Sequence, residues 1–200
     1  MKKLTLVSAL ALFCSSVIST GLNAQTTALA DKKETAPKTN VKEEVFMERY
    51  YNLKESYPSL TNLHGAFAAS SNAKTKFMER YYAIKASYPA LKNAHDNYAA
   101  SDHEMETFIK RYYEIKDVYA DLSKYWGDYA GSKKTLTEFI KRYNEIKASS
   151  PGMSEFYGQY AASDNTLVDF TTRYYGIKAS KAGMENGYGE YAGSTKKLAK

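Results

Sequence analysis

The stretch Phe108-Ile109-Lys110-Arg111-Tyr112-Tyr113-Glu114-Ile115-Lys116 decides the fold, because near-copies of it begin at Phe46, Phe77, Phe139 and Phe170. Successive starts differ by 31 residues (for example 108 − 77), and no insertion interrupts the series. A fixed period of this length is typical of stacked supersecondary units. The sequence therefore predicts an array of five equivalent units, starting at 46, 77, 108, 139 and 170, rather than one irregular globule.

Each unit begins with a pattern that predicts an amphipathic helix of about 16 residues. In the third unit the apolar residues recur at spacings of 3, 4, 3 and 4, which fits one helix face and not the alternation of a strand; they are Met105, Phe108, Tyr112, Ile115 and Tyr119. Proline follows in three of the units, at Pro58, Pro89 and Pro151. Because proline lacks an amide hydrogen, the first helix is expected to end there.

A second, shorter helix rich in small residues is predicted to fill the rest of each unit. A serine then recurs at one position, as Ser70, Ser101, Ser132, Ser163 and Ser194, and is predicted to cap the start of the next long helix. The predicted class is all-α: a tandem array of five 31-residue helix-turn-helix (αα-hairpin) repeats forming a short right-handed solenoid-like stack. This organisation is similar in kind to tetratricopeptide-like solenoids, although their Trp-Leu-Gly-Tyr signature is absent.

The N-terminal segment has the features of an export signal. Lys2 and Lys3 precede an apolar run that is too short to span a bilayer, and Ala24 follows as a small residue at the expected cleavage site. The predicted organisation is a signal peptide over 1–24, a flexible linker over 25–38 and the α-helical repeat domain over 39–200. The product is expected to be secreted, periplasmic or at the cell surface, with no transmembrane segment after cleavage.

Charge and composition disfavour several functions. The chain has 28 basic and 22 acidic residues, which is a mild excess of positive charge, so nucleic acid is an unlikely partner. The sequence has no phosphate-binding loop and no nucleophile elbow, and its conspicuous residues recur in every unit, so no enzymatic activity and no cofactor are predicted. His64, His95 and His103, without cysteines nearby, do not predict a metal site and are expected at the surface.

Three rows of recurring residues are the candidate binding residues. The rows are Tyr51, Tyr82, Tyr113 and Tyr175; Arg49, Arg80, Arg111, Arg142 and Arg173; and Lys54, Lys85, Lys116, Lys147 and Lys178. Identical positions in a regular stack align, and tyrosine suits sugar rings and wet protein interfaces. Two alternatives remain open at this point. Arginines can pair locally, for example Arg142 with Glu138, and the tyrosines can fill seams between units.

These features predict a secreted or cell-envelope binding protein, without enzymatic activity, that presents the three rows to an extended glycan or peptide partner. The alternative is a self-assembling structural or matrix protein, a homo-oligomer built by head-to-tail packing of the units. In that case the residues after Ser194, the first turn of a sixth helix, would be a joining edge rather than a cap. A third possibility is a chain that forms β-rich aggregates, which proline and the helical spacing disfavour.

Overall fold

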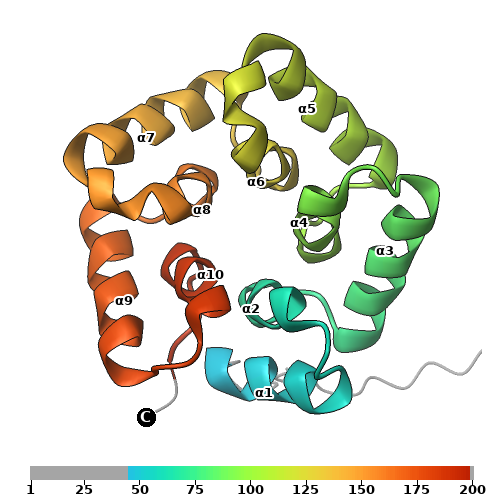
Figure 1. Ribbon diagram of the computed structural model, residues 1–200, viewed down its shortest axis with the longest axis vertical. Helices are drawn as coiled ribbons and strands as arrows, with labels where there is room; N and C mark the ends of the chain where they lie inside the picture. Colours follow the sequence, from blue (N-terminus) through green and yellow to red (C-terminus); the bar gives the residue numbers. More distant parts are fainter. Residues whose placement is uncertain (1–44, 199–200) are drawn as a thin grey trace, which may run out of the picture. The chain divides into compact units, whose positions relative to one another are not determined.

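Ten α-helices, arranged as five pairs, form most of the computed structural model (Figure 1). The structure describes residues 45–198. The first helix of each pair is long: α1 (Phe46–Ser56), α3 (Lys74–Ser87), α5 (Met105–Val118), α7 (Leu136–Ser149) and α9 (Leu167–Ser180). The second is short: α2 (Thr61–Ala69), α4 (His95–Ala100), α6 (Trp126–Gly131), α8 (Tyr157–Ala162) and α10 (Tyr188–Gly193). The predicted all-α class is confirmed. The predicted signal peptide over 1–24 and linker over 25–38 lie outside the described residues.

The long helices form where the 3-4 spacing predicts them, because that spacing places one apolar stripe on the side of the core. In α5 the buried residues are Phe108, Tyr112 and Ile115. The phenylalanine that opens each unit has no exposed surface in any of the five copies. Each long helix ends one residue before a position where the backbone leaves helical geometry, such as Tyr119 (φ −129°, ψ 69°). The core thus runs between the long and the short helices.

The short helices differ from the prediction of one continuous helix in each unit. In four of the five units a 3₁₀ segment precedes a six-residue α-helix; these segments are η1 (Lys92–Ala94), η2 (Ala120–Tyr125), η3 (Pro151–Phe156) and η4 (Glu185–Gly187). The backbone kinks at a buried apolar residue, such as Leu122 (φ −92°, ψ 28°) and Met153 (φ −105°, ψ 27°). Both side chains belong to the hydrophobic core.

The five pairs form a closed ring, with the short helices inside and the long helices outside (Figure 1). The last short helix, α10, lies beside the first, α2, as α2 lies beside α4. The expectation of a stack with two different ends is therefore not met within residues 45–198, because the first and last units lie against each other. A 31-residue spacing indicates equal rotation between neighbours, but the size of that rotation depends on side-chain packing, which the sequence pattern does not specify.

The contacts that close the ring repeat those found between every other pair of units. The amide of Phe46 donates to the carbonyl of Lys197 at 2.9 Å, as Phe77 donates to Ala73 at 2.9 Å and Phe108 to Glu104 at 3.0 Å. Lys197 therefore supplies the carbonyl that would belong to the residue four positions before Phe46. Val45 also pairs with Lys197 as an isolated parallel bridge. The residues after Ser194, expected to be a cap or a joining edge, complete the first turn of α1.

The aromatic contacts at this closure, which we call the seam, also match those elsewhere in the ring. The Phe46 ring meets Tyr191 edge to face with centroids 5.2 Å apart. The corresponding pairs within the ring, Tyr98 with Phe108 and Tyr129 with Phe139, have centroids 5.2 and 5.4 Å apart. The seam is thus one of five equivalent boundaries between units, and the only one that no peptide bond crosses in the described chain.

The recurring serine has another role than the predicted N-cap. All five serines are buried or nearly so, and Ser132 Oγ donates back to the carbonyl of Tyr129 at 2.9 Å, which places it at the C-terminal end of the short helix. The N-cap of the next long helix lies three residues later. There Thr135 and Glu138 form a capping box, with the Thr135 amide donating to Glu138 Oε2 at 2.9 Å.

Candidate functional site

The arginine row is engaged in internal contacts. In the third unit, Arg111 Nη2 donates to the carbonyls of Tyr129 at 2.9 Å and Lys134 at 2.7 Å, and its guanidinium carbon lies 4.2 Å from the centroid of the Tyr129 ring. The same arrangement recurs at Arg49, Arg80, Arg142 and Arg173. Each guanidinium thus ties the last carbonyls of a short helix to the loop that follows it.

This geometry gives the arginines a structural role that explains their recurrence. A short helix leaves several carbonyl groups without partners at its C-terminus, and a charged donor near that end is favourable. Arg142 and Glu138, predicted as a local ion pair, are not within ion-pair distance; Glu138 instead accepts from Thr135. A contact between the five arginines and a ligand stays a prediction.

The tyrosine row lies on the outside of the ring. Tyr51, Tyr82, Tyr113 and Tyr175 are 45%, 49%, 41% and 57% exposed, and all four lie on long helices. The preceding tyrosine of each pair is buried and contacts the exposed ring edge to face, with centroids 5.1 to 5.6 Å apart. The alternative in which the second tyrosine of each pair fills the boundary between two units is therefore not observed. Each exposed ring thus lies against a buried ring on one side and faces solvent on the other.

The lysine row accompanies the tyrosines. The ammonium of Lys116 lies 5.1 Å from the centroid of the Tyr113 ring, and that of Lys54 lies 5.8 Å from Tyr51. The other three contact the buried tyrosine of their own unit at 5.6 or 5.7 Å. None of the five forms an ion pair with a carboxylate in the described part of the chain. Tyrosine and lysine together form an outer aromatic and basic surface, which we call the belt.

The histidines are structural in this fold. His64 and His95, expected at the surface, are buried, and the Nε2 atom of each lies 2.9 Å from a carbonyl at the end of a long helix, that of Tyr57 or Tyr88. Trp126 occupies the same position in its unit and donates to the carbonyl of Tyr119 at 2.9 Å. No group of three or more potential metal-ligating side chains is found within residues 45–198. Over the same range, none of the helices has the length and apolar character to cross a bilayer.

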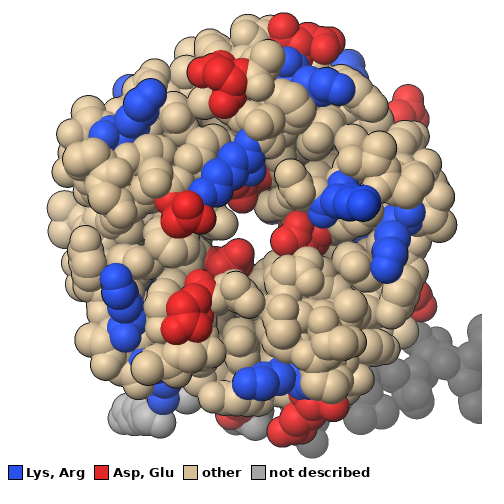
Figure 2. Space-filling model, in the orientation of Figure 1, with Lys and Arg blue, Asp and Glu red and all other residues tan. Residues whose placement is uncertain are grey.

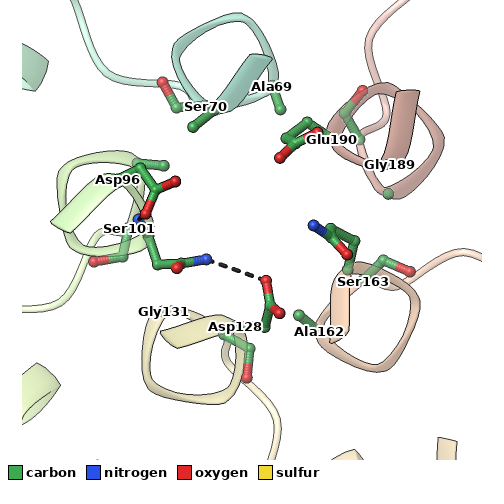
Figure 3. Close-up of a pocket in the computed structure, with 17 residues that line it drawn as sticks. Ala69, Ser70, Asp96, Ser101, Asp128, Gly131, Ala162, Ser163, Gly189 and Glu190 are labelled. Atoms are coloured by element: carbon green, nitrogen blue, oxygen red, sulfur yellow. Dashed lines mark hydrogen bonds between the residues drawn. The ribbon is translucent and has the colours of Figure 1, made fainter. Parts of the chain in front are cut away.

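The ring encloses a central pore. A cavity of about 240 Å³ lies between the five short helices, and an opening is visible at the centre of the face shown in Figure 2, bordered by acidic side chains. Small residues and the recurring serines form much of its wall. Asp96, Asp128 and Glu190 point into it from α4, α6 and α10 (Figure 3). The pore therefore has an acidic lining that no recurring motif predicts.

Each acidic group in the pore has a raised pKa, and the largest cause is its partial withdrawal from water. Burial raises the pKa of Asp96 to about 6. Burial, followed by repulsion from Asp96, raises the pKa of Asp128 to about 7. Burial, with repulsion from both aspartates, raises the pKa of Glu190 to about 8. The three carboxylates disfavour one another's ionisation, so the pore retains protons at neutral pH.

Sequence reasoning missed the acidic lining of the pore because the residues that carry it do not recur. The position that lines it is Ala66, Asn97, Asp128, Gln159 and Glu190 in successive units. A search for repeated residues selects the outer surface and the structural caps, and passes over a position that changes from unit to unit. The signal available in the sequence was the change of residue type at this one helical position, within repeats of constant length. Comparison with family models, curated proteins and solved structures found no match to this chain.

Proposed function

We propose that this chain is an exported binding protein, without enzymatic activity, in which five equivalent 31-residue units present the belt to an extended glycan or peptide. The observation that supports this proposal best is the exposure of four tyrosines, one on each of four outer helices, each in edge-to-face contact with a buried neighbour. An apolar ring that is already oriented loses little side-chain entropy when a partner stacks on it. The belt lysines, which have no carboxylate partner among the described residues, add hydrogen-bond donors on the same outer helices, and Lys54 and Lys116 lie beside exposed rings.

The belt favours an extended partner over a small molecule. The exposed tyrosines are distributed over separate outer helices, so a compact ligand can contact one unit, whereas a polymer can contact several in series. Contacts made in series raise the effective concentration at each following site, and avidity grows without any new type of contact. The arginines contribute indirectly in this proposal, because they fix the loops between units.

The alternative of head-to-tail assembly has weaker support. Its joining edge was to be the segment after Ser194, and Lys197 in that segment already bonds to Phe46 of the same chain. An edge that is occupied within the molecule is not available to a second copy unless the ring opens. Light scattering over a range of concentrations discriminates the two functions, because assembly requires a mass that grows with concentration.

Binding to a panel of cell-envelope polysaccharides and extended peptides, measured by titration calorimetry, tests the proposed function. The double variant Tyr82→Ser, Tyr113→Ser is expected to bind at least tenfold more weakly, because each aromatic stacking contact contributes on the order of 1 kcal/mol to binding. Val168→Ser is the control, because Val168 is exposed on α9 but lies outside the belt. Asn144 interrupts the row, so Asn144→Tyr is expected to strengthen binding.

Two results would contradict the proposed function. One is equal binding by the double tyrosine variant and the Val168→Ser control. The other is the absence of binding to every extended ligand in the panel while the circular dichroism spectrum shows that the helices are intact.

A further inference from the structure

Two of the boundaries between short helices are filled in an interlocking way. Asn97 of α4 reaches over Gly127 of α6, and Asp128 of α6 reaches over Gly158 of α8, so closely that a Cβ atom at either glycine would overlap the facing side chain. At Gly189 the Phe156 ring comes closest to such a Cβ atom, and Gln159 lies next to it. Asn97 and Asp128 thus lie in the space that a glycine of the next unit leaves open.

One boundary departs from this pattern, and the departure adds a charge. On α2 the residue facing the pore is Ala66, and the next unit has Asp96 where the other units have glycine. Asp96 therefore faces the pore beside α2, and Glu190 of α10 faces it on the other side of the same helix (Figure 3). The charge of Asp96 is the largest repulsive influence on Glu190. Two carboxylates thus flank α2, next to the seam.

Few cations offset these carboxylates. Lys124 of η2 acts favourably on Asp128 but pairs with Glu155 of η3 at 2.8 Å. His95 precedes Asp96 and acts favourably on it, while its Nε2 atom lies 2.9 Å from the carbonyl of Tyr88. The residues of α2 and α8 that line the pore carry no charge. Ionisation of all three acids therefore leaves the pore with an excess of negative charge in a confined space.

The ring can relieve such repulsion most easily at the seam. Every other boundary is crossed by the polypeptide, whereas the seam between α10 and α2 is held by noncovalent contacts: the Phe46 to Lys197 hydrogen bond, the Val45 to Lys197 bridge and the Phe46 to Tyr191 ring contact. Separation of α10 from α2 moves Glu190 away from Asp96 and admits water to both.

We propose that the pore is a proton-operated latch: with protonated carboxylates the seam between α10 and α2 stays closed, and with ionised carboxylates it opens. The latch is independent of the belt and of any partner. Proton binding to the closed form, and not to the open form, shifts the equilibrium between them as a ligand would. The raised pKa values of the three acids place the transition between mildly acidic and mildly alkaline pH.

Distance measurements between two spin labels across the seam test the latch in the full chain. Cys14, the only cysteine, is replaced by serine, and Asn62→Cys on α2 with Glu185→Cys in η4 provides the label sites. The matched control is the pair Thr61→Cys on α2 and Asn93→Cys in η1, across a boundary that the chain crosses. Thr61 is the repeat equivalent of Glu185, and Asn93 is the repeat equivalent of Asn62. All four sites are exposed.

The seam pair is expected to give one short distance at pH 5 and a longer, broader distribution at pH 9, while the control pair is unchanged. The variant Asp96→Asn, Asp128→Asn, Glu190→Gln is expected to keep the short seam distance at both values, since amides do not ionise. If the triple variant does not fold, Glu190→Gln alone should shift the opening to higher pH, whereas Asp117→Asn on the outer helix α5 should not.

Salt gives a second readout. An increase from about 0.05 to 0.5 M NaCl shortens the Debye length from roughly 14 to 4 Å and should close part of the open population at pH 9. The latch is overturned if the seam and control distances change together, if neither changes between pH 5 and 9, or if the triple amide variant opens as the parent chain does.

Discussion

Replacement of Arg111 by methionine should destabilise the ring more than any single change on its surface. Methionine keeps most of the apolar stem but removes the guanidinium, which donates to two carbonyls at 2.7 and 2.9 Å and lies over the Tyr129 ring. A hydrogen bond from a charged donor contributes about 1.5 to 3 kcal/mol. Because Arg111 is only half-buried, the lower end of that range applies to each bond.

Two such bonds and a cation–π contact of about 0.5 to 1 kcal/mol give an expected loss of about 3 to 4 kcal/mol in the free energy of unfolding. The two carbonyls left without their donor belong to the end of α6 and to the loop that follows it. Arg111→Lys keeps the charge and loses the fork geometry, so its expected loss is about half as large.

Urea unfolding followed by far-UV circular dichroism measures this loss as a lower midpoint at constant slope. Lys110→Met is the matched control, because Lys110 is the adjacent, exposed cation on the same helix, and the expected change is within about 0.5 kcal/mol. Equal midpoints for Arg111→Met and Lys110→Met would refute the structural role. Weaker ligand binding at unchanged stability would show instead that Arg111 contacts the partner.

Three further predictions concern the seam and the pore. Removal of residues 195–200 eliminates the Lys197 carbonyl and should cost about 2 to 3 kcal/mol by calorimetry; an unchanged melting temperature would contradict closure through this segment. Gly158→Ala places a methyl against Asp128 and should cost about 1 to 3 kcal/mol, whereas Gly176→Ala, with open space around it, should stabilise by about 0.5 to 1 kcal/mol. Because the pKa values of Asp96, Asp128 and Glu190 are raised in the folded state, the folded chain binds more protons than the unfolded one, so urea midpoints should correspond to a loss of about 2 to 4 kcal/mol between pH 6 and 8. Midpoints that rise over this window would contradict the raised values.

The sequence predicts the long helices well because their signal is local. Phe108, Tyr112 and Ile115 share one helical face whatever the neighbouring units do, and their burial follows from that spacing. The closure of the array is not local. It depends on the angle between neighbouring units, which small residues such as Ala99 and Ala130, both without exposed surface, help to set by permitting close approach. The spacing of 31 residues contains no information on that angle.

The candidate site likewise has parts that follow from local sequence and parts that depend on contacts between distant residues. The different burial of Tyr112 and Tyr113 follows from their adjacent positions on one helix. Only the choice for Tyr113 between facing solvent and packing between two units required the structure. The role of Arg111 could not be predicted, because its partners Tyr129 and Lys134 lie in the following short helix and in the loop after it, far along the chain. The variation at the position of Asp128 is visible in the sequence, but the pore is not, because Asp96 and Glu190 are far apart in the chain and line one cavity only when the ring closes.

The hydrogen bond from Phe46 to Lys197 has a consequence for where the polypeptide can start. Since this bond is the one that begins every other long helix, the position of the chain termini is arbitrary with respect to the fold. By register, a single residue inserted between Leu198 and Val45 would join the ends. A circular permutant opened at Ser71 or Asp164, which are exposed residues at equivalent positions of two loops, is then expected to retain the same five boundaries.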